Sequence, residues 1–171
     1  DPAYTRVYRR KRHSVATDLP MHRGVLDRAA AQAARWNIDY CCQISAGTLE
    51  KAGIDVKKYL PDGVSVLLLA DEYKLAKNAN AGDYIRIAGF NLHFCAYDIV
   101  RDWEYLGYTA MSQSAIDCKA LAAAIGLELD PEKGVQFEAI LCSGSMPDAI
   151  RICKKSGDLR KPLSQLVKKW A

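Results

Sequence analysis

Apolar residues recur at helical spacing in the first third of the chain and then alternate as strands do. Residues 24–37, GVLDRAAAQAARWN, are rich in alanine and predict a helix that stops at Asn37. Residues 38–44, IDYCCQI, alternate and predict a strand with Cys41 and Cys42 on opposite faces. A short helix with Thr48 as its N-cap is expected next.

A second strand and a long helix form the centre of the sequence. The turn LPDG at 60–63 leads into VSVLLLADE at 64–72, whose continuous apolar run predicts a central strand covered on both faces. The polar residues 73–84 are expected to form a loop with some helix. One apolar face of a helix is then predicted by Ile85, Ala88, Leu92, Cys95, Ile99, Trp103 and Leu106.

Glycines mark the ends of two helices. Gly107 can take the left-handed conformation of a helix C-terminus, which makes Tyr108 the expected first residue of a strand. Ser114 and Asp117 form a capping-box pattern at the start of another helix, and Gly126 ends it.

The remaining elements complete a layered domain. VQFEAIL at 135–141 alternates as a strand, and LRKPLSQLVKKW at 159–170 predicts a short basic helix. Helices and strands therefore take turns along the chain, which indicates an α/β or α+β layered fold with helices covering a sheet.

Length and composition are those of one globular domain. The chain has 171 residues, half of them hydrophobic, and a formal net charge of +4. We expect a basic arm at 1–20 and a single domain at 21–171. No segment reaches the roughly 20 apolar residues of a membrane span. The location can be the cytoplasm or, after removal of a signal, an exported compartment.

Charge and cysteine spacing exclude some classes of function. The basic arm is expected to be a solvated terminus, and no nucleic-acid-binding motif follows it. The six cysteines have neither CxxC nor Cys-His spacing. We therefore expect no metal ligands and no iron–sulfur cluster from this chain alone.

Few residues indicate chemistry directly. The sequence has no GxGxxG, Walker, HExxH or GxSxG motif. His93 can be a helix-flank residue or a polar pocket contact, and Tyr84 an ordinary helix-start residue or a pocket residue. The SGS of 143–145 can be a plain loop, or it can offer backbone N–H groups to a ligand.

Five segments in order resemble one family. They are AAAQAARWNIDYCCQIS, LPDGVSVLLLADE, NLHFCAYDIVRDWEYLGYTAM, ALAAAIGLELD and VQFEAILCSGSMP, between residues 27 and 147. They are similar to the corrinoid-binding core of reductive dehalogenases and epoxyqueuosine reductases, whose long helix ends in an R-x-L-G-Y-x-A pattern.

This resemblance implies a nitroreductase-like fold that holds cobalamin, a metal-containing cofactor, and receives electrons from iron–sulfur clusters. The family has a catalytic tyrosine near the start of the long helix, where this chain has Gly89, and Tyr84, the nearest tyrosine upstream, is our candidate for the catalytic proton donor. The loops 108–114, 125–134 and 142–146 would border the corrinoid. The implied cofactor contacts are His93, Tyr108, Ser112, Ser114, Gly126, Gly134, Ser143 and Gly144.

The departures from the family pattern leave alternatives open. The family's glycine-rich segment becomes GLELDPEKG, which keeps Gly126 and Gly134, and the cysteine-rich cluster segment is missing. A reductase would therefore need a partner iron–sulfur protein or domain. A cofactor-free interaction module and a flavin-binding nitroreductase relative, which would need a homodimer, are the alternatives.

Overall fold

A five-stranded antiparallel sheet lies between two layers of helices. The computed structural model describes residue 21 and residues 23–74, 81–145 and 149–152. The strands are β1 (Tyr40–Ile44), β2 (Ser65–Lys74), β3 (Ala110–Gln113), β4 (Lys133–Cys142) and β5 (Ala149–Ile152), in the order β3-β4-β2-β1-β5. The predicted layered α+β architecture, a sheet covered by helices, is confirmed.

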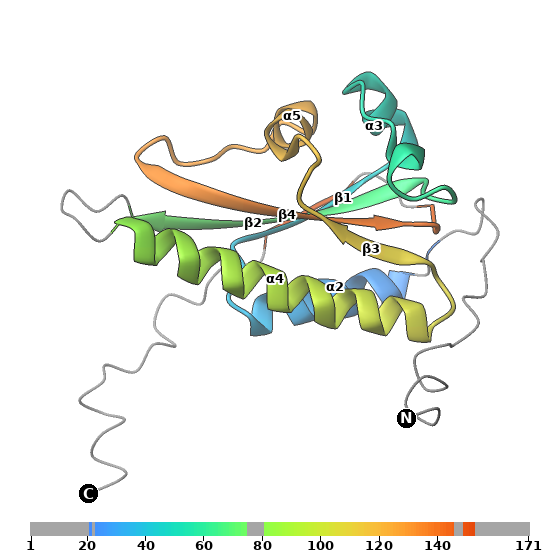
Figure 1. Cartoon of the computed structure of the whole chain (residues 1–171), viewed down its shortest axis with the longest axis horizontal. Coiled ribbons are helices and arrows are strands. Elements are labelled where there is room, and N and C mark those ends of the chain that lie inside the picture. The colour runs from blue at the N-terminus through green and yellow to red at the C-terminus, as the bar shows by residue number, and fades with distance from the viewer. Residues whose placement is uncertain (1–20, 22, 75–80, 146–148, 153–171) are drawn as a thin grey trace, which may run out of the picture.

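Helices cover both faces of this sheet (Figure 1). Helices α2 (Arg23–Arg35) and α4 (Ala81–Tyr105) lie on one face, and α3 (Ala46–Lys51) and α5 (Cys118–Ala124) lie on the other. The 3-10 turn η1 (Val56–Lys58) follows α3. The described helices include none long and apolar enough to cross a membrane.

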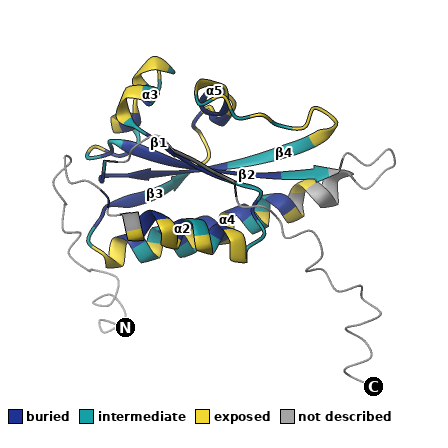
Figure 2. Cartoon of the chain, turned by 180° about the vertical axis from the view of Figure 1, so that it is seen from behind, coloured by how far each residue is buried: buried dark blue, intermediate teal, exposed yellow. Residues whose placement is uncertain are grey.

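The central strand β2 separates two hydrophobic clusters. Leu67 and Leu69 pack with α2 and α4, whereas Val66 and Leu68 pack with α3 and α5. All four side chains are fully buried, which confirms the strand covered on both faces (Figure 2). Adjacent residues diverge in this way because side chains alternate across a strand.

Strand β1 shows the same alternation. Cys41 belongs to the cluster beneath α2 and α4, and Cys42 belongs to the cluster beneath α3 and α5. Both are buried, so the predicted placement of this vicinal pair on opposite faces is confirmed.

The predicted helix ends are confirmed in backbone geometry. Gly107 follows α4 with φ 99°, and Gly126 follows α5 with φ 66°. Asn37, after α2, also takes a positive φ of 57°. These residues close their helices in the left-handed region, where glycine and asparagine are tolerated best.

Two predicted N-caps were wrong. The cap of α3 is Ser45, whose Oγ accepts the N–H of Thr48, because the helix begins before Thr48. The cap of α5 is Asp117, whose carboxylate accepts the N–H of Ala120. Ser114 lies before this helix and is exposed.

Other boundaries differ from the prediction. Helix α4 starts at Ala81, inside the expected loop, and the stripe residues Ile85 and Leu106 at its two ends are about 40% exposed. Strand β3 begins at Ala110 instead of Tyr108. Strand β5 was not predicted, and the basic arm and the predicted C-terminal helix lie outside the described residues.

Candidate functional site

A buried carboxylate joins a half-exposed histidine at the β3 side of α4. Glu138 of β4 is only 6% exposed, and its Oε1 accepts a hydrogen bond from the Oγ of Ser112 in β3. Its Oε2 lies 3.7 Å from Nδ1 of His93 in α4, a side chain that is 47% exposed. The three residues therefore connect the covered sheet to solvent, and Glu138 has the partners that a buried carboxylate needs.

An aromatic ring flanks the solvent side of this cluster. The rings of His93 and Tyr97 are one helical turn apart on α4 and meet edge to face, with centroids 4.4 Å apart. Tyr97 is 53% exposed. His93 is thus held between a carboxylate and an aromatic ring, where a ligand on the surface can reach it.

Register explains why the sheet brings these residues together. Ser112 pairs with Ile140, so the same-face neighbour two residues earlier in β4 is Glu138. Asp71 in β2 is also buried, and its partner Gln136 is on the Glu138 face. Two carboxylates on neighbouring strands therefore lie beneath α4.

Glu138 was missed in the sequence. The alternation in VQFEAIL at 135–141 predicts a strand, but by itself it places Glu138 on the face of that strand expected to contact solvent. Only the long helix covering that face makes Glu138 buried. One feature of the sequence could have indicated a buried Glu138: it is a charged residue in a strand whose two faces both carry apolar residues.

Three of the expected cofactor contacts build the junction between α4 and β3 instead of an open surface. Tyr108, Ser143 and Gly144 are all buried. The N–H of Thr109 donates to the Oγ of Ser143 at 3.0 Å, and the N–H of Ser143 donates to the Thr109 carbonyl at 2.9 Å. The ring of Tyr108 packs on Gly144.

The other expected contacts are dispersed. Ser114 is exposed beyond the end of β3, and Gly126 closes α5 on the opposite face of the sheet. Gly134 lies at the far end of β4, where it pairs with Tyr73 of β2. Tyr84 belongs to the first turn of α4, and its side chain lies outside what the structure describes. The structure thus brings His93 and Ser112 together, and separately Tyr108, Ser143 and Gly144.

A second polar cluster stabilises the far end of the sheet. Glu72 accepts hydrogen bonds from the Tyr40 hydroxyl, the backbone N–H of Asp130 and Nζ of Lys133, at 2.9–3.2 Å. Burial opposes ionisation of Glu72, but the donors at Asp130 and Lys133 outweigh it and hold the pKa of that carboxyl below its usual range. Burial and the Glu72 carboxylate raise the pKa of Tyr40.

The thiols of Cys118 and Cys142 are buried, and burial keeps them in the protonated, unreactive form. Burial, with the carboxylates of Glu138 and Asp117, raises the pKa of Cys118 to about 12. Burial also raises the pKa of Cys142 to about 12. Because the thiolate is the nucleophile, neither residue suits covalent catalysis.

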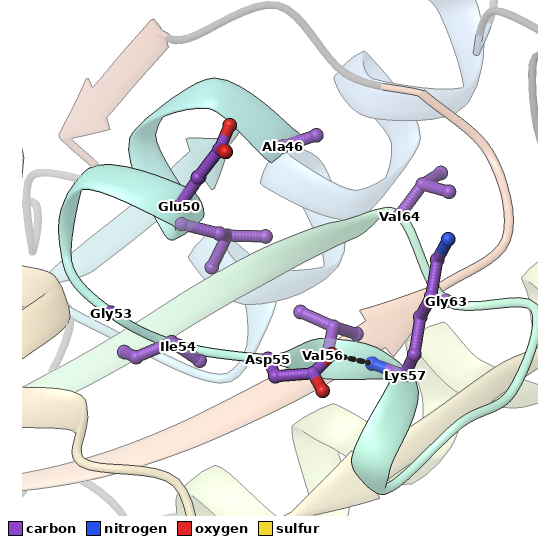
Figure 3. A pocket seen from close by; sticks show the side chains of 10 residues that line it. Ala46, Glu50, Gly53, Ile54, Asp55, Val56, Lys57, Gly63 and Val64 are labelled. Carbon is purple, nitrogen blue, oxygen red and sulfur yellow. Dashed lines mark hydrogen bonds between the residues drawn. The ribbon is translucent and has the colours of Figure 1, made fainter.

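A cavity of about 510 Å³ opens on the other face of the sheet, between α3, η1 and the start of β2 (Figure 3). Leu49, Ile54 and Val56 supply apolar lining, and Glu50 and Lys57 supply charge. None of the expected site residues lines it. Within the described ranges, no three His, Cys, Asp or Glu side chains are grouped to hold a metal ion.

Comparison with known proteins identifies the fold. No family model matches the sequence, and no curated protein matches it. The chain is similar to a nitroreductase family protein from Clostridium difficile, with a TM-score of 0.52 and 9% identity over 91% of this chain and 92% of that one. The nitroreductase-like α+β fold expected from the sequence is therefore confirmed.

Two other similar structures are more distant. A reductive dehalogenase studied for B12-dependent dehalogenation has a TM-score of 0.48 and 14% identity; the match covers 92% of this chain and 25% of that one. A nitroreductase-like protein from Bacillus cereus has a TM-score of 0.47 and 13% identity, over 97% of this chain and 94% of that one.

Proposed function

We propose that this chain is a corrinoid-binding domain whose contact surface is centred on His93. The observation that carries the proposal is the cluster in which a buried Glu138 holds both Ser112 and the half-exposed His93. A half-exposed histidine with a carboxylate 3.7 Å from its Nδ1 and the ring of Tyr97 packed edge to face against its own is a polar contact already supported on two sides.

The chemistry of the cluster favours a corrinoid over a flavin nucleotide. A flavin mononucleotide presents a phosphate, which binds best to arginine, lysine or backbone N–H groups. The cluster instead has the carboxylate of Glu138, with Asp71 on the next strand. The amide side chains of a corrinoid are neutral and both donate and accept hydrogen bonds, so they suit the polar atoms of His93 and Ser112, whereas the buried negative charge behind these residues disfavours a phosphate.

The protein residues would bind and orient the cofactor. His93 and Ser112 would contact its polar rim, and Tyr97 would cover the edge beside His93. When bound, the corrinoid would supply cobalt redox chemistry, as cofactors generally supply the difficult chemistry. Following the family resemblance, we assign Tyr84 the role of proton donor and expect electrons from an iron–sulfur partner protein or domain.

The visible spectrum tests this proposal. The protein is incubated with hydroxocobalamin, desalted and measured, with a parallel sample in flavin mononucleotide. We expect close to one equivalent of retained corrinoid and no retained flavin. His93→Ala and Ser112→Ala should each lower retention, because each removes a polar contact at the proposed surface.

A matched control is Lys57→Ala, at the cavity on the opposite face, which should retain corrinoid as the wild type does. Retained flavin instead of corrinoid would establish the nitroreductase alternative. A colourless protein from both incubations would overturn cofactor binding and leave an interaction module of the same fold.

A further inference from the structure

The cavity between α3, η1 and the start of β2 has the size and the lining of a small-molecule site. Its volume of about 510 Å³ falls in the range of roughly 300–1,000 Å³ that ligand pockets have. Leu49 and Val56 are buried members of the hydrophobic cluster on this face of the sheet, and the half-buried Ile54 packs against that cluster. All three side chains line the cavity. An apolar body would therefore gain free energy by leaving water for this cavity.

The shape of the cavity is built into the backbone around it. The carboxylate of Asp55 caps η1, and its Oδ1 accepts the backbone N–H of Lys57 at 3.0 Å. Gly53 turns the chain after α3 with a φ of 71°. A Cβ built on Gly63 would lie 2.6 Å from Cγ1 of Val56, so a side chain at that position would push Val56 out of the lining. The cavity is thus preformed, as small-molecule sites usually are.

Two charges of opposite sign lie on either side of this cavity. Figure 3 shows Glu50 of α3 on one side and Lys57 of η1 on the other. Both side chains are exposed, and within the part of the chain that the structure describes neither forms an ion pair. Asp55, the third charged residue of the lining, is occupied in capping η1. Glu50 and Lys57 are therefore available to pair with a ligand.

The arrangement of these charges disfavours several classes of ligand. A phosphate or a fatty-acid carboxylate could pair with Lys57 but would meet the negative charges of Glu50 and Asp55. An organic cation could pair with Glu50 but would be repelled by Lys57. A molecule that carries both an ammonium group and a carboxylate satisfies both residues. Because Glu50 and Lys57 lie on opposite sides of the cavity, the two charges belong at opposite ends of the ligand, as in a short peptide, and not on one carbon, as in an amino acid.

We propose that this cavity binds a short apolar peptide with free termini. The ammonium group of the peptide pairs with Glu50, its carboxylate pairs with Lys57, and its side chains contact the apolar lining. Ion pairs between exposed groups are weak, so the apolar contacts supply most of the affinity and the two charges set the orientation. The site lies on the face of the sheet opposite the His93 cluster, so peptide binding needs no cofactor.

Amide NMR shifts of the isotope-labelled protein during a titration with leucyl-phenylalanine test the proposal, and their outcome is separate from that of the visible spectrum. We expect saturable shifts centred on residues 46–64, which line the cavity. The dipeptide should bind about tenfold more tightly than leucine or phenylalanine, because one residue fills less of the apolar lining and does not reach both charges. Equal binding of the free amino acids would overturn the assignment to a peptide. An absence of saturable shifts at 46–64 would overturn the site.

A charge reversal tests the orientation of the peptide. Lys57→Glu should bind leucyl-phenylalanine about tenfold more weakly than the wild type, because the peptide carboxylate would then face only negative charges. Amidation of that carboxylate should restore binding to the variant, whereas the same amidation should weaken binding to the wild type. A Lys57→Glu protein that still prefers the free carboxylate would overturn the assigned orientation.

The matched control is Lys58→Glu. Lys58 is the neighbouring exposed lysine, but its Nζ lies over the ring of Tyr59, 5.7 Å from the ring centroid, and it does not line the cavity. Its affinity for the dipeptide should stay within about twofold of the wild type, because a charge outside the site is screened by solvent. Both lysines are exposed, so the far-ultraviolet circular dichroism of both variants should match that of the wild type. An equal loss of affinity in the two variants would show a general effect of charge and overturn the pairing with Lys57.

Discussion

Tyr108 lies so close to Gly144 that position 144 has no room for a side chain. A Cβ built on Gly144 would come within 2.8 Å of Cε1 of Tyr108 and within 2.7 Å of Cγ of Met21. The contact joins the start of the β3 segment to the loop after β4. Gly107, Tyr108 and Gly144 thus form one tight junction.

Gly144→Ala should destabilise the protein by about 1–3 kcal/mol, because the new methyl group must displace a buried ring. Chemical denaturation measures the change. Gly89→Ala is the control: position 89 lies within α4 with nothing near the added atom, so alanine should stabilise by about 0.5–1 kcal/mol. Equal effects of the two variants would contradict this account.

Gly107→Ala should cost about 1–2 kcal/mol for a different reason. The φ of Gly107 is 99°, a region that side chains with a Cβ rarely occupy. Gly24→Ala in the first turn of α2, which has open space and no positive φ, should not destabilise the protein. Thermal unfolding of both variants tests the point, and an unaffected Gly107→Ala protein would argue against the left-handed turn.

Glu72→Gln should lower the free energy of unfolding by about 1–2 kcal/mol near neutral pH, because the ionised carboxylate accepts from Lys133 and Asp130. The folded-state pKa of Glu72 is lowered, so its contribution is present above the unfolded pKa and is lost as the pH falls through the folded value. The difference between wild type and variant should therefore shrink in acid.

Denaturant titrations across an acid-to-neutral pH series measure this difference. The exposed Glu128→Gln is the control and should show little difference at any pH. A stability gap at Glu72 that is constant through the acid range would contradict the assigned role of its charge.

Cys118 and Cys142 should resist alkylation in the folded protein, because a pKa of about 12 leaves almost no thiolate at neutral pH. Brief treatment with iodoacetamide followed by peptide mass spectrometry tests this. Both should be modified after denaturation, and a Ser114→Cys variant, at an exposed position, should react in the folded state. Rapid native modification of Cys142 would show that the loop after β4 opens.

Short sequence patterns predicted helices and strands correctly where a residue type is tied to one structural role. The run at Val66–Leu69 predicted a central strand because only a strand covered on both faces buries every residue of such a run. Gly107 and Gly126 predicted helix ends because few other residues tolerate their backbone angles.

The errors have physical causes as well. Ser45, Thr48, Ser114 and Asp117 can all cap a helix, and only the path of the chain decides which one does. Strand β5 could not be predicted because its pairing with β1 is a long-range contact. Ile85 and Leu106 fit the periodicity of α4 but lie where the helix extends past its cover.

The candidate site was predicted only in part. His93 and Ser112 were named from a resemblance; the register of β3 with β4 places Ser112 beside Glu138, and the packing of α4 on the sheet places His93 there. Glu138 itself depends on which helix covers β4, and alternation along one strand does not contain that information. The interior positions of Tyr108, Ser143 and Gly144 likewise depend on packing between distant segments.

The pairing of β2 with β4 also has a consequence during synthesis on the ribosome. Ser65 pairs with Cys142 and Lys74 with Lys133, so the central strand emerges long before its second neighbour. At 5–20 residues per second the delay is roughly 3–14 s. During that time one edge of a strongly apolar strand is open to other chains. Yield in a bacterial host should therefore depend on chaperones that shield nascent chains, and slower translation before residue 142 should increase aggregation.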